Sequence, residues 1–273
     1  MGLGDQLIGS SFAKGARARG KRIALGDGKQ LRWDHNSEQV FRHNPNLVFP
    51  GDTLTANDIE WKSYYKGSRL YNQQVGDRWI WNYDFYAEPG EFFFTDAELK
   101  VVQKMGLPRG FVVIEPNTNK LVHRAEYLRN KQWPFERYEE LVEKIRREGR
   151  HVVQFIYGGN QRRLHGAALV QTPSYRSAAA ILAQASLYVG SEGGLHHAAA
   201  AVGRPAVVMF GGWVPPAVLG YRTHINLVGG ATEFCGLLRP CQHCAEAMSR
   251  ISVEEALSAA IEQLERFPQN APA

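Results

Sequence analysis

The feature that most constrains the fold is a regular alternation of short apolar runs and helical segments in the second half of the chain. The apolar runs are residues 111–114, 151–156, 169–172, 187–189 and 205–210. Segments with helical spacing of apolar residues lie between and after them, at 135–148, 175–185, 195–202 and 252–267. Short, mostly apolar runs are typical of strands that are buried on both faces. The alternation therefore predicts a parallel sheet with helices on both faces.

A sheet of this kind also predicts where a ligand binds. In open parallel sheets, ligands lie beyond the carboxyl ends of the strands, where the connecting loops gather. The loops after residues 114, 156, 189 and 210 are therefore predicted to form the functional site.

The first half of the chain is less regular. A Gly-rich turn within residues 2–19 predicts the start of a helix, and residues 22–25 predict a strand. Residues 61–94 are rich in Trp, Tyr and Phe without a clear period, which predicts irregular structure lining a cleft or, alternatively, a local aromatic core. Pro and Gly punctuate residues 106–110, where we predict the hinge between a domain of residues 1–107 and a domain of residues 108–273.

Composition restricts the class of partner without naming it. The 273 residues carry a formal net charge of +5, which suits a phosphorylated ligand, an anionic membrane surface or a nucleic acid. The basic residues are scattered, and no nucleic-acid-binding motif is present, so a nucleic acid is not expected. The sequence has no apolar run of about 18 residues and no charged-then-apolar leader pattern, so a cytoplasmic protein is expected.

The segment 189–212 carries the clearest functional signal. A strand leads into a Gly-containing turn, and a helix of small residues begins at once. Glycine lets the backbone approach a ligand closely, and a helix N-terminus offers N–H groups and a positive dipole end to a phosphate. Glu192 can accept hydrogen bonds from sugar hydroxyls, and His197 can contact phosphate or sugar. The alternative is an ordinary strand–helix turn with two incidental histidines.

This segment resembles the donor-site motif of glycosyltransferase family 9, the ADP-heptose:lipopolysaccharide heptosyltransferases. The likeness lies in an acidic residue, Gly and His at the spacing of Glu192, Gly194 and His197, followed by Gly-Arg-Pro at 203–205 and Phe-Gly at 210–211. The resemblance implies that Glu192, Gly193, Gly194 and His197 bind a nucleotide-sugar donor. The usual acidic residue of the family is Asp, so Glu192 is a departure that changes the reach of the carboxylate.

Two further stretches extend the resemblance on the donor side. Lys131, Trp133 and Pro134 match the family's Lys/Arg-x-Trp-Pro segment, which implies that Lys131 contacts the donor pyrophosphate. A cation there stabilises the departing nucleoside diphosphate. Asn117 and Thr118 match polar residues that lie near the phosphates in the family. The acidic residue that the family places near the nucleobase is replaced by Gly-Gly-Asn at residues 158–160, so the preferred nucleobase stays open.

The N-terminus resembles the Gly-Asp turn that follows the first strand of the family. The match implies that Asp5 is the general base that takes the proton of the acceptor hydroxyl. The alternative is that Asp5 only caps the first helix. Because residue 1 already lies in the turn, we expect either a truncated start or an N-terminal sheet without its first strand.

Three cysteines and one histidine form a separate cluster near the C-terminus. Cys235, Cys241 and Cys244, with His243 between the last two, have the close spacing of soft ligands for zinc or iron. An odd number of cysteines in one stretch is not a disulfide framework. The alternative is three buried, reduced cysteines. Many members of the resembling family have a Cys-rich loop here, and an iron-binding version occurs in members that modify autotransporter proteins.

Together these features predict two Rossmann-like domains facing a cleft, the type-B glycosyltransferase fold. The expected reaction is inverting transfer of a heptose or related sugar, without a cofactor, to a glycan, lipid-linked or protein acceptor in lipopolysaccharide or other cell-surface polysaccharide synthesis. Peripheral contact with the inner membrane is left open. A nucleotide-sugar epimerase or hydrolase on the same fold and a non-catalytic nucleotide-sugar-binding protein remain as alternatives.

Overall fold

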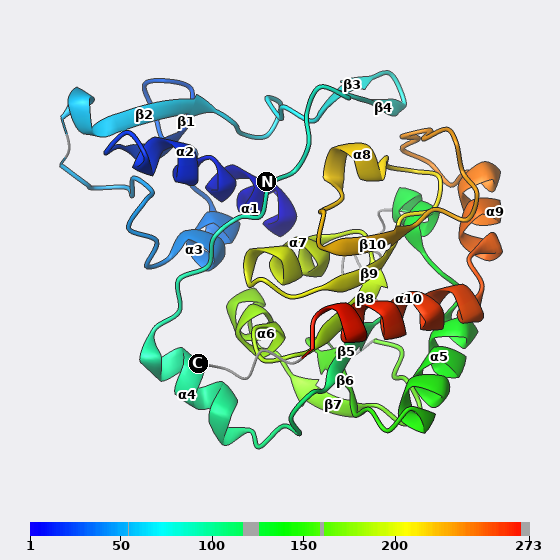
Figure 1. Ribbon diagram of the computed structural model, residues 1–273. Helices are drawn as coiled ribbons and strands as arrows, with labels where there is room; N and C mark the ends of the chain where they lie inside the picture. Colours follow the sequence, from blue (N-terminus) through cyan, green and yellow to red (C-terminus); the bar gives the residue numbers. More distant parts are fainter. Residues whose placement is uncertain (54, 117–125, 159–160, 269–273) are drawn as a thin grey trace.

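The protein is built around a six-stranded parallel sheet with the strand order β10-β9-β8-β5-β6-β7 (Figure 1). The computed structural model describes residues 1–53, 55–116, 126–158 and 161–268. The strands of this sheet are β5 (Val112–Glu115), β6 (Val152–Ile156), β7 (Ala168–Gln171), β8 (Leu187–Ser191), β9 (Ala206–Met209) and β10 (His224–Leu227). The chain runs outward from β5 to β7 and then returns to the other side of β5. The order therefore reverses between β5 and β8, and a crevice at their carboxyl ends is the expected ligand site.

Helices cover both faces of this sheet, as the alternation of apolar runs predicts. On one face lie α5 (Phe135–Arg147) and α10 (Val253–Arg266), and on the other lie α6 (Tyr175–Leu182) and α7 (Gly194–Ala201) (Figure 1). Successive strand residues serve the two faces in turn: Val112 and Ile114 pack in the core under α5 and α10, whereas Val113 packs in the core under α6 and α7. The remaining elements of this half are the 3-10 helix η3 (Glu126–Lys131) and the helices α8 (Pro216–Leu219) and α9 (Gln242–Arg250).

Local signals set the ends of several helices. The predicted N-cap of the last helix is confirmed, because the Ser252 side chain accepts a hydrogen bond from the backbone N–H of Glu255. The cap of α6 is Ser174, and Ser177 completes a reciprocal capping box with it. Strand β10 and helix α9 were not predicted. Strand β10 has only four residues, whereas α9 does carry a helical pattern, because Cys244, Ala247 and Met248 are buried at a spacing of three and four residues.

The N-terminal half is smaller and contains two short sheets. Strands β1 (Arg22–Gly26) and β2 (Ile59–Ser63) pair in parallel, and β3 (Asn72–Val75) and β4 (Arg78–Trp81) form an antiparallel hairpin. The helical elements of this half are α1 (Leu3–Ser11), α2 (Ala13–Arg17), α3 (His35–Phe41), η1 (Ala56–Asp58) and α4 (Asp96–Lys104). Within described residues 1–53, the only strand is β1, which follows α1 and α2, so no strand precedes the first helix.

The prediction of irregular structure for residues 61–94 is wrong in part. The segment contains the end of β2 and the whole β3–β4 hairpin. Val75 pairs with Arg78 across a two-residue turn in which Gly76 adopts a φ of 58°. Glycine followed by Asp is a recognised hairpin-turn signal, so this element could have been found from the sequence. The hairpin was missed because Trp, Tyr and Phe residues occur in the loops as well as in the strands, so they show no strand period.

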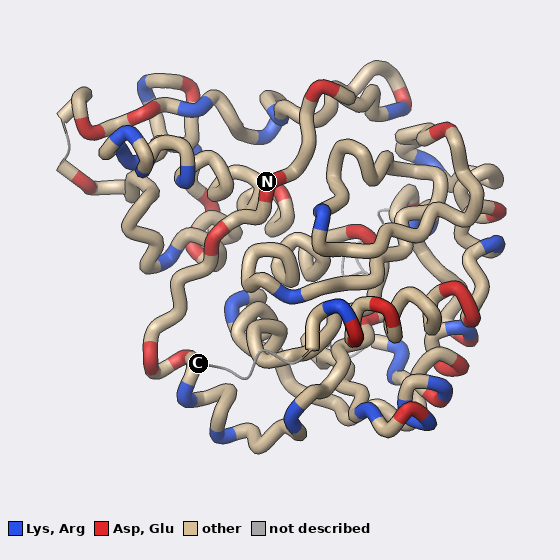
Figure 2. Tube along the Cα trace, viewed as in Figure 1, with Lys and Arg blue, Asp and Glu red and all other residues tan. Residues whose placement is uncertain are grey.

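The two halves share one continuous hydrophobic core. Helix α1 packs directly on α7, and Leu7 and Ile8 of α1 belong to the same buried cluster as Ala198 and Ala199 of α7. Lys and Arg residues are interleaved with Asp and Glu along much of the drawn chain, as on α5, whereas α10 carries four Glu and one Arg (Figure 2). Among the described residues, no helix is both long enough and apolar enough to span a membrane.

A buried arginine also ties the halves together. The Arg176 side chain of α6 donates to Glu98 of α4 at 2.7 and 3.0 Å. It also donates to the backbone carbonyls of Gln39, Arg42 and Phe93. The hydrogen bond from Arg176 lowers the pKa of Glu98 from 4.5 to about 2. One side chain thus satisfies acceptors on three segments of the N-terminal half.

We expect the Arg176→Met substitution to lower the free energy of unfolding by about 3 kcal/mol, because Glu98 loses its guanidinium partner and keeps only Thr95, and three carbonyls lose their hydrogen bond from Arg176. Urea denaturation measures the loss. The folded state lowers the pKa of Glu98, so the ionised Glu98–Arg176 pair stabilises the fold above pH 4.5 and stabilises it less as the pH falls toward about 2. The difference in the free energy of unfolding between wild type and Arg176→Met should therefore become smaller over that range of pH. The control is Arg147→Met, which removes an exposed pair with Glu143 and should change stability by less than about 0.5 kcal/mol. Equal losses in the two variants would contradict the role of Arg176.

Candidate functional site

A pocket of about 750 Å³ lies between the two halves, where the sheet order reverses. All four loops predicted from the strand ends reach it, through Glu115, Tyr157, Glu192 and Trp213. The N-terminal half supplies the opposite wall, which includes Asp5, Lys66, Arg69, Tyr71, Trp79 and Trp81. The prediction that the aromatic segment 61–94 lines a cleft is therefore confirmed, although its secondary structure was not predicted.

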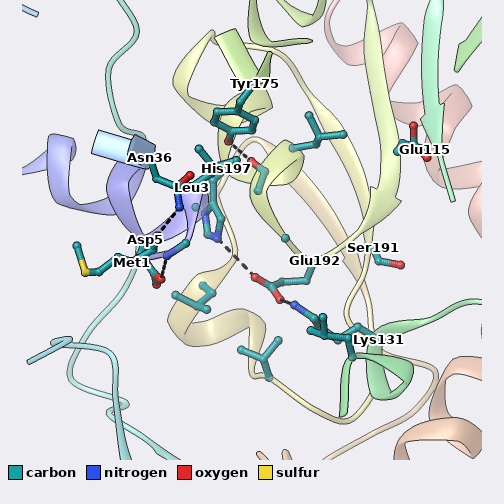
Figure 3. A pocket seen from close by; sticks show the side chains of 18 of the residues that line it. Met1, Leu3, Asp5, Asn36, Glu115, Lys131, Tyr175, Ser191, Glu192 and His197 are labelled. Atoms are coloured by element: carbon teal, nitrogen blue, oxygen red, sulfur yellow. Dashed lines mark hydrogen bonds and ion pairs between the residues drawn. The ribbon is translucent and has the colours of Figure 1, made fainter. Parts of the chain in front are cut away.

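The centre of the pocket wall is a buried ion pair. Lys131 Nζ lies 2.6 Å from Glu192 Oε2, and the two residues are 7% and 6% exposed (Figure 3). The ammonium also lies 5.0 Å from the centre of the Trp213 ring. Burial raises the pKa of Glu192, but Lys131 and the hydrogen bond with His197 outweigh burial and hold that pKa well below its ordinary range. Glu192 is therefore a buried carboxylate whose charge is balanced by Lys131.

His197, on helix α7, contacts Glu192 with one ring nitrogen and Tyr221 with the other. Its Nε2 atom lies 3.5 Å from Glu192 Oε1, and its Nδ1 atom is 2.7 Å from the Tyr221 hydroxyl (Figure 3). Helix α7 begins at Gly194, three residues before His197, and Gly193 is its N-cap. Gly193 and Gly194 both line the pocket, so the first turn of the helix is oriented to favour a bound phosphate.

Asp5 lies on the opposite wall and is engaged at both oxygens. Oδ2 accepts a hydrogen bond from the backbone N–H of Gly2 at 2.8 Å, and Oδ1 accepts one from the Tyr71 hydroxyl. Arg69 Nη1 lies 3.8 Å from Oδ1. Burial and then the charge of Asp5 raise the pKa of Tyr71 well above its ordinary value, so Tyr71 remains a donor. Asp5 does cap α1, as the alternative interpretation holds, but a carboxylate has about four acceptor sites and can still accept from a ligand.

Gly4 lies where the pocket wall that carries His197 meets the wall that carries Asp5. A Cβ atom on Gly4 would lie 2.5 Å from Cδ2 of the His197 ring, closer than real Cβ atoms come. Only glycine at this position lets α1 approach α7 closely enough to bring Asp5 and His197 to one pocket. Gly4 lies within α1 rather than in the Gly-rich turn that the sequence predicts, and its lack of a side chain serves the packing of the two halves.

The remaining predicted site residues divide into two groups. Asn117 and Thr118 lie outside the described residues. Cys235, Cys241, His243 and Cys244 come together, with one ligand atom of each within 4.8 Å of the others. Cys235 Sγ lies 3.2 Å from Cys244 Sγ and 3.9 Å from Cys241 Sγ. The His243 ring packs against Gly212: a Cβ atom added to Gly212 would lie 2.5 Å from Cε1 of His243.

The loop that carries the cysteines supports the pocket from behind. Asn130, the neighbour of Lys131, donates to the carbonyls of Leu237 and Arg239 and accepts from the backbone N–H of Cys241. Trp213 donates to the Leu237 carbonyl at 2.8 Å. The β3–β4 hairpin is fastened to the same loop, since Trp79 N–H donates to the Gly236 carbonyl at 2.9 Å. A rigid cysteine loop would therefore hold both Lys131 and the hairpin in place.

Several groups that line the pocket or support it from behind were not identified from the sequence. Tyr221 follows Gly220 in a stretch without periodicity, so nothing in the sequence connects it with His197. Tyr71 and Arg69 belong to the aromatic segment that was expected to line a cleft, but their contact with Asp5 depends on packing over long sequence separations.

The sheet order, the buried ion pair and the helix N-terminus at the reversal point define an α/β protein suited to a phosphorylated ligand. A family model described as glycosyltransferase family 9 (heptosyltransferase) matches residues 92–243, more than half of the chain. The chain belongs to glycosyltransferase family 9, which confirms the resemblance recognised in its donor motif.

Several solved structures are similar to the chain. The glycosyl transferase family 9 protein from Veillonella parvula DSM 2008 is 16% identical, with a TM-score of 0.50, and the match covers 66% of this chain and 55% of that one. ADP-heptose lps heptosyltransferase II of E. coli is 16% identical, with a TM-score of 0.48, and the match covers 70% of this chain and 56% of that one. The likeness to the Veillonella protein confirms the α/β, type-B glycosyltransferase fold class predicted from the sequence.

A third similar structure is that of the iron-containing dodecameric glycosyltransferase TibC from enterotoxigenic E. coli. It is 14% identical, with a TM-score of 0.47, and the match covers 61% of this chain and 49% of that one. The chain thus spans only about half of the length of each of these proteins. No curated protein sequence matched the chain.

The close approach at Gly4 gives a direct test of how the halves are joined. We expect Gly4→Ala to lower the free energy of unfolding by about 1–3 kcal/mol, because the added methyl group forces His197 or α1 to move. Urea denaturation measures the change. The matched control is Gly15→Ala in α2, where the nearest atom to a new Cβ is 3.7 Å away. That variant should be neutral or more stable by up to about 1 kcal/mol. A neutral Gly4→Ala would show that α1 does not pack on His197.

Proposed function

We propose that this protein is an inverting glycosyltransferase that moves a heptose or related sugar from a nucleoside diphosphate sugar to an acceptor in lipopolysaccharide or other cell-surface polysaccharide synthesis. The observation that carries the proposal is the Lys131–Glu192 pair beside the N-terminus of α7, at the reversal point of the sheet. Membership in glycosyltransferase family 9 supports the reaction class.

On the donor side, each residue has a separate task. Lys131 and the backbone N–H groups at Gly193 and Gly194 bind the pyrophosphate, and the positive charge stabilises the nucleoside diphosphate as the glycosidic bond breaks. Glu192 accepts from hydroxyls of the transferred sugar, and His197 orients Glu192. Asn117 and Thr118 contribute to phosphate binding by their match to the family.

On the acceptor side, Asp5 is the general base. Single displacement with inversion requires a base that takes the acceptor proton as the hydroxyl attacks the anomeric carbon. Gly2 and Tyr71 hold the carboxylate in one orientation, and Asp5 lines the pocket. In this division, residues 1–107 form the acceptor-side domain and residues 108–273 form the donor domain.

The acceptor is a glycan, a lipid-linked saccharide or a protein side chain, and the transfer step needs no cofactor. The site of action is the cytoplasm, with peripheral contact to the inner membrane when the acceptor is lipid-linked. Lys and Arg are interleaved with Asp and Glu along much of the drawn chain (Figure 2), so this charge pattern gives no support for binding to an extended nucleic acid.

Paired substitutions separate donor binding from catalysis. The double substitution Lys131→Met with Glu192→Gln removes both buried charges, so the fold should survive, whereas Lys131→Met alone leaves a buried carboxylate unpaired at a cost of about 3–5 kcal/mol. We expect the double variant to bind the nucleotide-sugar donor at least about tenfold more weakly, measured by calorimetry. Asp5→Asn should keep the donor Kd within about twofold and lower kcat by at least about 100-fold, measured as transfer to purified acceptor glycans.

Four results would contradict these assignments. Unchanged donor affinity in the double variant would remove Lys131 and Glu192 from the donor site. Full transfer activity in Asp5→Asn would exclude Asp5 as the base. Donor binding by the wild-type protein without any transfer would favour the non-catalytic alternative, and donor turnover without an acceptor would favour an epimerase or hydrolase.

We also propose that Cys235, Cys241, His243 and Cys244 hold one zinc or iron ion as a structural site. Three sulfur ligands and one ring nitrogen within 4.8 Å suit a tetrahedral ion of either metal. The hydrogen bond between Cys244 and Cys235 lowers the pKa of Cys235 to about 5 and raises the pKa of Cys244, so one thiolate forms readily in this pair and a bound ion would have to stabilise the second. The ion would fix the loop that supports Asn130 and Trp213.

Metal analysis of protein purified without a His-tag should find about one zinc or iron per chain. The Cys244→Ser variant should lose most of that metal and unfold at a lower temperature, because Cys244 is fully buried and lies closest to Cys235. His243→Ala should also reduce the metal content, whereas His165→Ala, an exposed histidine outside the cluster, should retain it. Metal-free wild-type protein with unchanged thermal stability would contradict the site.

A further inference from the structure

The cation that is to bind the donor pyrophosphate is already engaged. Lys131 Nζ lies 2.6 Å from Glu192 Oε2, and the side chains of the two residues are only 9% and 6% exposed. A nucleoside diphosphate must therefore compete with Glu192 for this ammonium. The inference below rests on the proposed role of Lys131 in donor binding and concerns what happens to Glu192 during that exchange.

A carboxylate that loses its cation in this position cannot remain uncompensated. Glu192 would stay buried, and an unpaired buried charge costs several kcal/mol. The phosphates bring additional negative charge to the same wall. The second group within reach of Glu192 is His197, whose Nε2 atom lies 3.5 Å from Oε1 (Figure 3). A protonated His197 would restore the balance of charge.

The groups around His197 favour this residue as the proton acceptor. His196, with its ring centre 4.5 Å from that of His197, and His224 on β10 are buried behind it. Burial lowers the pKa of His196 well below its ordinary value and lowers that of His224 to about 4, so both remain neutral. The other neighbours are Glu192, Lys131 and Tyr221, together with α1, whose Asp5 carboxylate is held by Gly2 and Tyr71.

Tyr221 allows His197 to exist in either charge state. Its hydroxyl lies 2.7 Å from His197 Nδ1. Burial raises the pKa of Tyr221 above its ordinary value, so the hydroxyl stays protonated. A hydroxyl can donate to the bare nitrogen of a neutral ring or accept from the N–H of an imidazolium. Tyr221 is thus a positioning residue that keeps Nε2 directed at Glu192 in both states.

We propose that binding of a nucleoside diphosphate transfers Lys131 from Glu192 to the phosphates, and that His197 takes up one proton from water as it replaces Lys131 beside Glu192. The ammonium keeps its three protons and changes only its partner. The proton enters from solvent at Nδ1 of His197, because Nε2 already carries the hydrogen that faces Glu192, and Tyr221 turns from hydrogen-bond donor to acceptor. The protein side chains of the site therefore carry one more positive charge when the nucleoside diphosphate is bound than when the site is empty.

Proton uptake gives binding a defined pH dependence. A complex that holds one proton more than the free protein becomes weaker by about tenfold for each unit of rising pH while the uptake is complete. The donor is therefore held most tightly at the acidic end of the working range, and its release is accompanied by loss of the proton.

The experiment is calorimetric titration at about pH 8, where free histidine side chains are neutral and nucleoside diphosphates are fully ionised. The probes are ADP, GDP, UDP and CDP, each in Tris and HEPES buffers, which differ in ionisation enthalpy. The slope of the observed enthalpy against that ionisation enthalpy gives the number of protons taken up. We expect about one for wild type and near zero for His197→Gln, with about tenfold weaker binding in that variant at pH 8.

Matched variants assign the proton. Glu192→Gln should bind without uptake, since no buried carboxylate is left to compensate. Tyr221→Phe should show reduced uptake, which a purely structural role would leave unchanged. His151→Gln, an exposed histidine at the opposite end of the sheet, should behave as wild type. Wild-type binding without uptake overturns the proposal, and uptake that persists in His197→Gln overturns it by assigning the proton to another group. Absence of binding by every nucleotide overturns the donor role of Lys131 itself and the proposal with it.

Discussion

The ion pair between Lys131 and Glu192 is the interaction on which the arrangement of the pocket depends. Its two members come from η3 and from the end of β8, so the pair fixes the position of a loop relative to the central sheet. A buried ion pair adds little net stability compared with apolar side chains, but removal of one partner strongly lowers the free energy of unfolding. The pair therefore acts mainly on geometry: it excludes arrangements in which the loop and the strand end lie apart.

Much of the half that contains the six-stranded sheet could be predicted, because the sequence signals that mark its strands and helices are local. Apolar runs mark strands, Ser252 marks a helix start, and Glu192 directly follows a strand that reaches the reversal point of the sheet. Lys131 lies 61 positions earlier in the chain, and only the resemblance to a family connected it with Glu192. The structure places the two in contact, so the family motif carried spatial information that spacing alone does not contain.

The unpredicted features depend on contacts between distant parts of the chain. Tyr221 meets His197, and Tyr71 meets Asp5, through the packing of whole elements against each other. No periodic pattern encodes such meetings. The reduced N-terminal half illustrates the same limit: its two sheets have only two strands each and are too small to bury a core of their own, and its apolar side chains join the cluster that includes Ala198 and Ala199.

The attachment of the two halves at separate places has a mechanical consequence. Arg176 fastens α6 to the N-terminal half at one place, and the contact of Trp79 with Gly236 fastens the β3–β4 hairpin to the cysteine loop at another (Figure 1). The packing of α1 on α7 in the shared core adds a further attachment. Because the halves are joined at several places, neither can rotate against the other without breaking buried contacts, so the pocket cannot widen without losing part of that core.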